Sequence, residues 1–318
     1  LTKLNLNNAN IKDIAVLGGL TNLRDLQIGW NQINDYSALA NLKQLRYLNL
    51  YSSQISTIPE LGATASLEQL ELGDNPITTL AGLPEMPSLR YINLNNTQIT
   101  DLSPLSGSQN LQNISARTAR LQSLTLSNLP GLNQLELSDN QITSIVIDGV
   151  PNLHWIDLNN NRLTGFAGLE VASNLSYLYL HNNLIRNVAS IKPVLASTPL
   201  QELTLTSNEI SVLGDAFDAM SEGNLDLSGN PLLCDEAASF RANKSRGLRF
   251  TFSTECEYDT DGDGVVDSRD AFPDDPAAAI DNDLDGLPDA WNEGKGLGDS
   301  TTGLTEDTDD DNDGVEDG

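Results

Sequence analysis

Five carboxylates stand within the twelve residues DTDGDGVVDSRD, which run from 259 to 270. Calcium, a hard cation, prefers six to eight oxygen ligands held in a flexible cage. Oxygen donors fall at positions 1, 3, 5, 7, 9 and 12 of this stretch, namely Asp259, Asp261, Asp263, the carbonyl of Val265, Asp267 and Asp270. Gly264 at position 6 permits the sharp turn that such a loop needs. The spacing therefore predicts a calcium site.

The same phase recurs twice further along the chain. A second loop presents Asp281, Asp283, Asp285, the carbonyl of Leu287 and Asp289, although Asn292 stands at position 12. A third presents Asp309, Asp311 and Asp313, and the sequence ends before its position 12. Two like charges 4 Å apart repel by about 1 kcal/mol in water and about 4 kcal/mol at an effective dielectric of 20. We therefore expect order only with a bound cation. The alternative is a solvated acidic linker, although such linkers do not repeat glycine in phase.

The residues that follow the first loop decide against a helical calcium switch. A switch of that kind needs helices on both sides of each loop, and Pro273 and Pro276 prevent one here. The pattern DxDGDGVxDxxDAFPxDP resembles the bacterial form of the thrombospondin type 3 repeat, with Phe272 where animal versions place a cysteine. The resemblance implies that residues 257–318 wrap around successive calcium ions with little hydrophobic core, and that Asp274 and Asp275 add further oxygens.

The charge of the chain is concentrated in this segment. Formal charge is −28 overall, and residues 255–318 hold 23 Asp/Glu against two Lys/Arg. This balance argues against nucleic acid and anionic membranes as partners and suits cations. The sequence contains no run of 18 apolar residues, so it does not predict a membrane-spanning segment. The chain begins at Leu1 without a methionine and ends at Gly318 inside an Asp-rich run, so we expect a piece of a longer protein.

A repeat fills the preceding residues. The phrase LxxLxLxxNxI starts at 1, 23, 45, 67 and 89, continues less regularly from 111, 132, 153, 175 and 200, and closes as NLDLSGNPL at 224–232. These are about eleven repeats, of which the sixth is the poorest match. One repeat cannot bury its own leucines, but stacked repeats bury a continuous core. The asparagines at position 9 are expected to satisfy backbone groups of the turns.

These phrases resemble the leucine-rich repeat, and NQINDYSALANL looks like the 22-residue class typical of bacterial internalins. The resemblance implies an α/β solenoid, a leucine-rich repeat horseshoe with a parallel β-sheet on its concave face. The connections suit short helical turns or extended segments. We expect the array at 1–232, without its N-terminal cap, a cap at 233–256, and irregular calcium-loop repeats at 257–318.

The expected cap holds the two cysteines of the chain, Cys234 and Cys256. NPLLC, a helix-like DEAASFRANKSRG and an apolar LRFTF resemble the cysteine-bearing caps of leucine-rich arrays. We predict that the two cysteines pair in a disulfide, the alternative being two buried free thiols. A disulfide would place the protein outside the reducing cytosol, secreted or at the cell surface.

Aromatic side chains occupy the outward positions of the predicted strands. Aromatic rings with a polar tip are common anchors of protein and sugar interfaces. The candidate partner-binding residues are Trp30, Tyr47, Tyr51, Tyr91, His154, Trp155, Tyr177, Tyr179 and His181. The alternative is that they reflect only β-propensity and cross-strand packing.

No enzyme motif is recognisable in the sequence. GxSxG, HExxH and a phosphate-binding loop do not occur, and the two histidines have no motif partner, so we expect no catalytic activity. The predicted function is extracellular protein recognition or adhesion with a calcium-rigidified stalk. The alternative is a carbohydrate- or matrix-binding accessory region of a larger secreted enzyme. The oligomeric state stays open.

Overall fold

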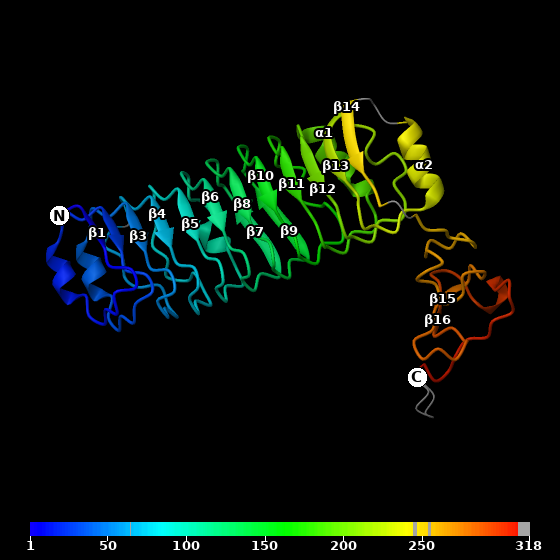
Figure 1. Cartoon of the computed structure of the whole chain (residues 1–318), viewed down its shortest axis with the longest axis horizontal. Coiled ribbons are helices and arrows are strands. Elements are labelled where there is room, and N and C mark those ends of the chain that lie inside the picture. Colours follow the sequence, from blue (N-terminus) through cyan, green and yellow to red (C-terminus); the bar gives the residue numbers. More distant parts are fainter. Residues whose placement is uncertain (64, 244–246, 254–255, 311–318) are drawn as a thin grey trace.

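The computed structural model describes residues 1–63, 65–243, 247–253 and 256–310. Figure 1 shows a long stack of coils, coloured blue to yellow, followed by a smaller segment in orange and red below the end of the stack. No helix among the described residues is long and apolar enough to cross a membrane.

The repeats build one parallel sheet. Each LxxLxL phrase places a strand at its positions 3 to 5, and the leucines at positions 4 and 6 turn inward, as Leu26 and Ile28 do with no exposed surface. Neighbouring strands pair in register, for example Leu4 with Leu26 and Leu26 with Leu48. The sheet has twelve strands in the order β1 (Lys3–Asn5), β2 (Asp25–Gln27), β3 (Tyr47–Asn49), β4 (Gln69–Glu71), β5 (Tyr91–Asn93), β6 (Asn113–Ser115), β8 (Gln134–Glu136), β10 (Trp155–Asp157), β11 (Tyr177–Tyr179), β12 (Glu202–Thr204), β13 (Glu222–Asp226) and β14 (Gly247–Thr251).

The prediction of a leucine-rich-repeat solenoid with a parallel sheet is confirmed. The curvature of a horseshoe is not confirmed, and Figure 1 shows an extended stack. Side chains at positions 3 and 5 point outward, because successive residues of a strand face opposite sides. We call this outward surface, where the sequence predicts a concave face, the sheet face.

The connections between neighbouring strands of the sheet are longer than the strands themselves, as residues 6–24 between β1 and β2 show. They include helical turns, as expected, namely η1 (Ala15–Gly19), η2 (Ser37–Asn41), η3 (Ser103–Leu105), η4 (Ala189–Ile191) and the short helix α1 (Lys192–Ser197). A second, two-stranded parallel sheet of β7 (Ser123–Ser127) and β9 (Ser144–Asp148) was not predicted. Its signal is the alternation in SLTLS and SIVID, in which Leu124 and Leu126 are buried.

Asparagines at position 9 link successive coils, as the sequence predicts. Asn75 is 2% exposed. Its amide nitrogen lies 2.9 Å from the carbonyl oxygen of Leu50 in the preceding coil and 2.8 Å from that of Leu72. Its Oδ1 accepts hydrogen bonds of 2.9 Å from the backbone nitrogens of Ser53 and Ile55. One buried side chain thus satisfies backbone groups of two coils.

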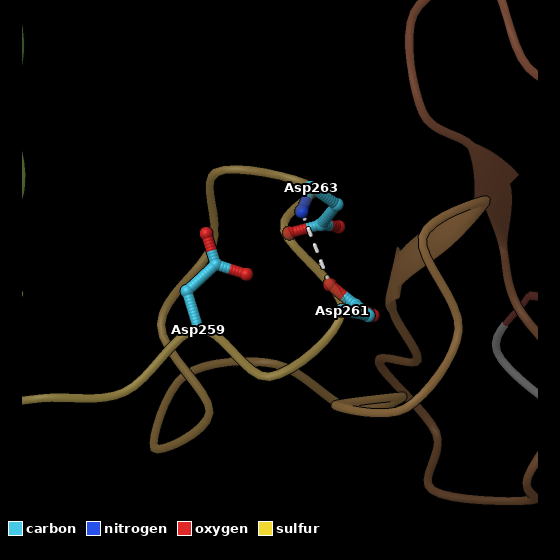
Figure 2. A group of neighbouring side chains, drawn as sticks. All are labelled: Asp259, Asp261 and Asp263. Atoms are coloured by element: carbon cyan, nitrogen blue, oxygen red, sulfur yellow. Dashed lines mark hydrogen bonds between the residues drawn. The ribbon is translucent and has the colours of Figure 1, made fainter.

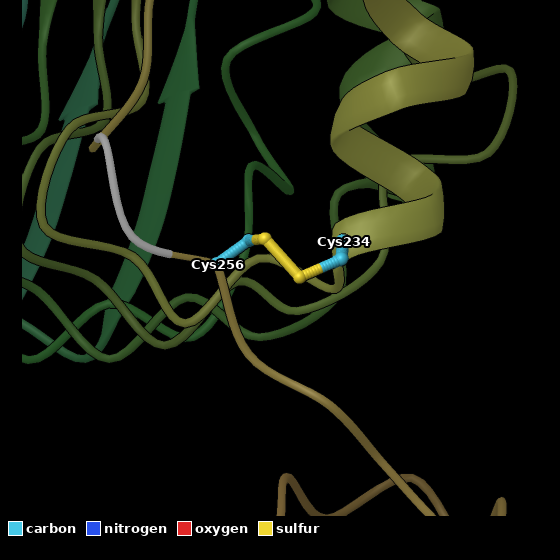
Figure 3. Close-up of a disulfide and its surroundings, with 2 residues drawn as sticks. All are labelled: Cys234 and Cys256. Atoms are coloured by element: carbon cyan, nitrogen blue, oxygen red, sulfur yellow. A yellow bond between two sulfur atoms is a disulfide. The ribbon is translucent and has the colours of Figure 1, made fainter.

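A helix and a disulfide close the array. The helix α2 (Cys234–Asn243) precedes β14, and Cys234 is bonded to Cys256 with their Cα atoms 5.0 Å apart (Figure 3). The predicted disulfide is confirmed. Phe240 packs its ring against Phe217 of the array and against Phe250, at centroid distances of 6.2 and 5.3 Å. The last coil therefore has an aromatic cover over its core.

The Asp-rich segment has little regular structure. β15 (Ala278–Ile280) pairs antiparallel with β16 (Ala290–Trp291), and η5 (Leu297–Asp299) follows. Its buried apolar side chains are small in number and size: Val266, Ala277, Ala278 and Ala279. So small an apolar core contributes little hydrophobic stabilisation, and the polar contacts within the loops gain weight accordingly.

Candidate functional site

The first aromatic group on the sheet face centres on Trp30 and Tyr51. Their ring centroids lie 4.9 Å apart, and Trp30 is 47% exposed. Its φ angle is 55°, in the left-handed region. Position 8 takes this conformation throughout the array, generally with the small polar residues that tolerate it. A left-handed backbone conformation is strained for a residue as bulky as tryptophan. The conformation of position 8 therefore does not account for a tryptophan at this place.

The second group lies on β10 and β11. Trp155 and Tyr179 approach to 5.5 Å between centroids, and His154 meets the edge of Tyr177 at 5.2 Å. His181 follows Tyr179 in the same coil, and its Nδ1 lies 2.6 Å from the hydroxyl of Thr206 in the next coil. The structure thus brings four of the five candidate residues of repeats eight and nine together as contacting pairs, and His181 contacts Thr206 instead.

Tyr47 and Tyr91 lie on either side of β4. Register pairs both of them with Gln69, two residues before Glu71. Burial raises the pKa of Tyr91 to about 12, and the negative charge of Glu71 adds to the shift. Burial also raises the pKa of Glu71, against a hydrogen bond of 2.7 Å from the amide of Asn93. This part of the face is half-buried and carries negative charge.

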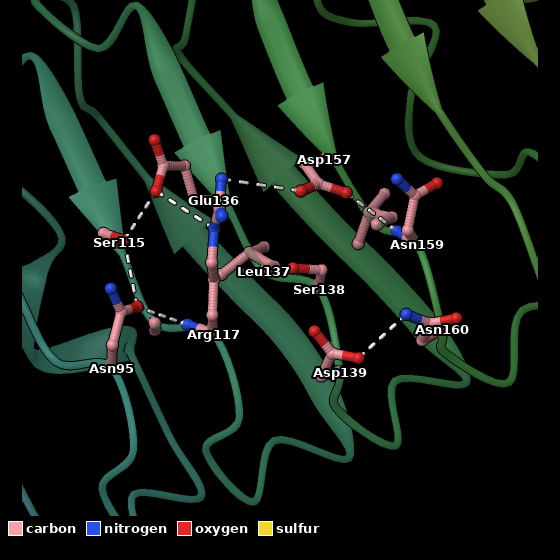
Figure 4. Close-up of polar contacts among 12 residues, drawn as sticks. Asn95, Ser115, Arg117, Glu136, Leu137, Ser138, Asp139, Asp157, Asn159 and Asn160 are labelled. Carbon is pink, nitrogen blue, oxygen red and sulfur yellow. Dashed lines mark hydrogen bonds and ion pairs between the residues drawn. The ribbon is translucent and has the colours of Figure 1, made fainter. Parts of the chain in front are cut away.

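An arginine crosses the middle of the sheet face. Figure 4 shows Arg117 between two carboxylates, with its Nε 3.2 Å from Glu136 and an Nη 3.8 Å from Asp157. Burial raises the pKa of Asp157, and a backbone hydrogen bond from Asn159 and the charge of Arg117 oppose the shift. The hydroxyl of Ser115 lies 2.7 Å from Glu136. These polar and charged side chains of the sheet face were not predicted as site residues from the sequence.

The first Asp-rich loop gathers the three alternating aspartates. Oxygen atoms of Asp259, Asp261 and Asp263 lie within 4.8 Å of one another (Figure 2). Asp259 accepts backbone hydrogen bonds from Gly262 at 2.7 Å and Gly264 at 3.1 Å. Both glycines have φ in the left-handed region, at 78° and 98°. The glycine spacing therefore turns the chain around the first aspartate.

The second loop has the same geometry. Asp281, Asp283 and Asp285 bring oxygens within 4.8 Å, and Asp281 accepts a 2.9 Å bond from Gly286 just as Asp259 does from Gly264. Leu284 takes the place of the first glycine and adopts φ 64°. Leu284 is therefore held in the same left-handed region as Gly262 of the first loop, a conformation that is strained for a residue with a side chain. The carbonyl-bearing residues of both loops are anchored alike, since Val265 and Leu287 donate to Asp263 and Asp285 at 2.7 and 2.8 Å.

A third group differs from the one predicted. Asp289 lies within 4.8 Å of Asp307 and Asp310, neither of which follows the spacing of the first two loops. Asp309 donates its backbone nitrogen to Asp307 at 3.0 Å. The predicted ligands Asp311 and Asp313 lie outside the described residues. A density of carboxylates at 306–310 was visible in the sequence, but no spacing rule assigned them to Asp289.

Several carboxylate oxygens in these loops are buried without a hydrogen-bond partner in the described part of the chain. They are one Oδ2 each of Asp261, Asp270, Asp283 and Asp307. Asp270 is 9% exposed, and burial raises its pKa to about 6, with the charges of Asp263, Asp261 and Asp259 adding to the rise. Buried charged oxygens need a compensating partner, and these loops supply none from the protein.

Two further residues tie the segment together. Asp275 is 1% exposed and accepts hydrogen bonds from the hydroxyls of Ser300 and Thr302 at 2.5 and 2.6 Å. Its oxygens accept hydrogen bonds from protein groups, whereas the resemblance implied that they would bind calcium. Asn292, at position 12 of the second loop, donates to Asp263 of the first at 2.6 Å. The two loops are therefore joined by a direct bond.

Comparison with known proteins agrees with the repeats. Leucine-rich-repeat sequence families match residues 19–40, 65–107 and 115–163. The chain therefore contains leucine-rich repeats. No curated protein sequence matches it. The sequence comparisons do not extend to the Asp-rich segment, and nothing in them points to catalysis.

Solved structures share the fold. An internalin, InlF, from Listeria monocytogenes is 26% identical, with 76% of this chain and 73% of that one covered and a TM-score of 0.63. The functional domain of InlJ from the same organism is 21% identical over 80% of this chain and 53% of its own, with a TM-score of 0.64. Toll in the Drosophila Toll–Spatzle complex is 21% identical over 76% of this chain and 40% of its own, with a TM-score of 0.55.

Proposed function

We propose that the chain is an extracellular recognition module, secreted or on a bacterial surface, whose sheet face binds a protein partner. The observation that carries the proposal is the pairing of half-buried aromatic side chains on this face, above all Trp155 with Tyr179. Large rings with polar tips give much contact area at small entropic cost. The exposed outer surface of β9, by contrast, presents Val146 and small polar residues.

Likeness to proteins of related fold supports the same role. The Toll structure is a complex with Spatzle. The internalin fold shares the extended sheet on which the aromatic pairs lie. The disulfide fits an oxidising environment.

We also propose that the Asp-rich segment binds calcium and stiffens the chain beyond the array, in the manner of thrombospondin type 3 repeats. Support comes from the matching geometry of the first two loops and from the buried, unpartnered oxygens of Asp261, Asp270 and Asp283. A bound dication would supply the missing partner for each. Extracellular modules of this kind bind calcium at roughly 10⁻⁴ to 10⁻³ M.

The protein-binding proposal is tested with an array of extracellular protein ectodomains probed by the whole chain in millimolar calcium. A partner that binds the wild-type chain is expected to bind the double variant Trp155→Ala, Tyr179→Ala at least tenfold more weakly. Val146→Ala, an exposed residue of β9 away from the sheet face, serves as control and keeps affinity. Equal binding by both variants, or a large fall in melting temperature for the double variant, would count against the proposal.

A further inference from the structure

A shallow groove of about 770 Å³ crosses the sheet face where four strands begin. Asn113 opens β6, Gln134 opens β8, and His154 and Ser176 directly precede β10 and β11. Three strand-to-strand steps of about 4.8 Å give the groove a length of roughly 14 Å. Its lining is Gln112, Asn113, Gly131, Asn133, Gln134, Asn152, His154, Asn174, Ser176 and Pro199.

The chemistry of this lining is unusual for the chain. Formal charge is −28 overall, yet no Asp, Glu, Lys or Arg belongs to the residues that line the groove. Six of them carry side-chain amides. An amide offers both hydrogen-bond donors and an acceptor, whereas a carboxylate offers acceptors only. The groove therefore matches a ligand whose own groups both donate and accept and which carries no charge.

Several of these amides are fixed in orientation. The amide nitrogen of Asn152 donates to the carbonyl of Pro130 at 2.7 Å, and that of Asn174 donates to Pro151 at 2.6 Å. Asn133 donates to the carbonyl of Asn152 at 3.3 Å. With each nitrogen held by the protein, the amide oxygens present acceptors that need no reordering when a ligand binds.

One aromatic ring, that of His154, lines the groove. It meets the edge of Tyr177, which pairs in register with Trp155, and these two residues lie outside the lining. The hydroxyl of Tyr177 is held by Gln201 at 3.1 Å. Rings positioned beside amides can cover apolar C–H surface of a ligand while the amides bind its hydroxyls. A sugar ring combines these two kinds of surface.

The charges around the groove narrow the class of ligand. Glu136 and Asp157 follow Gln134 and Trp155 on the same strands. Arg117 pairs with both of them, so the three side chains together keep one net negative charge, which disfavours an anionic sugar or a phosphate. A cationic ligand would find no counter-charge in the groove itself. We propose that this groove binds a neutral oligosaccharide, either free or carried by a glycosylated surface. Glycan binding and protein binding are tested with different ligands, so either proposal can fail while the other holds.

The proposal is tested with the whole chain in calcium on an array of neutral oligosaccharides, with polygalacturonate as the anionic comparison, followed by calorimetry on the glycans that bind. Neutral glycans are expected to bind with measurable heat. Gln134→Ala and His154→Ala are each expected to weaken binding at least fivefold. The matched control is Gln69→Ala, the first residue of β4 and the same repeat position outside the groove.

Each outcome decides the matter. No binding to any neutral glycan at millimolar concentration overturns the proposal, as does binding confined to polygalacturonate. Equal losses in Gln134→Ala and Gln69→Ala would place the sugar elsewhere on the face. Melting temperatures of all three variants are measured, and a variant that melts early is replaced in the comparison by Asn152→Ala, whose side chain is exposed. Gln134, unlike His154, is not one of the candidate partner-binding residues, so Gln134→Ala is also probed on deglycosylated ectodomains, where it is expected to bind as the wild type does.

Discussion

The carboxylate of Asp267 holds Thr260 through two hydrogen bonds of 2.7 Å, one from the backbone nitrogen and one from the hydroxyl. In the second loop Asp289 holds the backbone nitrogen of Asn282 in the same way, at 3.1 Å. Each loop is therefore closed by the aspartate at its position 9. The remaining aspartates are left to face one another, which is unfavourable without a cation.

Replacing Asp261 by asparagine tests whether the first loop binds calcium. Its Oδ2 is buried without a protein partner, and an amide nitrogen there would direct a donor at the ion. We expect calcium affinity of the first site to fall at least tenfold in calorimetric titration of protein first treated with EDTA. Asp148→Asn, an exposed aspartate of β9 in the array, should bind as the wild type does. Identical heats for both variants would refute the assignment.

Removing the disulfide should destabilise the cap. The bridge spans 22 residues of sequence, and closing a loop of this length stabilises by about 3 kcal/mol in the chain-entropy estimate. The double variant Cys234→Ser, Cys256→Ser is expected to unfold at lower urea concentration and to gain protease sensitivity around α2. Cleavage that begins instead near β1 would contradict this.

The asparagine ladder should carry measurable stability. Asn140 is 8% exposed, and its amide nitrogen lies 2.9 Å from the carbonyl oxygen of Ala116 in the preceding coil. Asn140→Ala leaves buried backbone groups unpaired, at about 1–3 kcal/mol. Gln141→Ala, at the exposed neighbouring position, controls for loss of an amide. The two are compared by urea denaturation, and equal midpoints would argue against the ladder.

Burial of Glu71 predicts a pH dependence. Its pKa is raised in the folded chain by burial, so the folded state binds this proton more tightly than the unfolded state does. The resulting stabilisation is complete below the ordinary carboxyl pKa and is lost as pH rises through the folded pKa. Glu71→Gln keeps an acceptor for Asn93 and removes the charge. We expect its melting temperature to exceed that of the wild type by about 2–4 °C at pH 7 and to match it at pH 3.

The control for this prediction is Glu60→Gln, an exposed residue of a connection, which should melt like the wild type at both pH values. A lower melting temperature for Glu71→Gln at pH 7 would show that the carboxylate stabilises the face.

The repeats could be predicted from the sequence because the buried leucines recur at a regular spacing, which stays recognisable where single positions of a repeat are substituted. Ser53 and Thr97 replace the asparagine of position 9 and are still buried. The β7–β9 sheet was missed because five-residue alternation inside a connection is a weak signal beside the 22-residue period. Asp307 and Asp310 were missed because long-range folding of the tail, rather than local spacing, brings them to Asp289. The uncharged groove arises from amides in different repeats, and no motif joins these residues in sequence.

The backbone bonds between coils repeat without change along the array. Arg24 and Asp25 both donate to the carbonyl of Thr2, and one coil later Arg46 and Tyr47 both donate to the carbonyl of Arg24. Excision of residues 23–44 would place Arg46 opposite Thr2 and restore the same contact. The span of the sheet face is therefore adjustable in whole steps of one strand spacing, about 4.8 Å. A deletion that does not remove a whole repeat would shift this pattern and turn leucines outward.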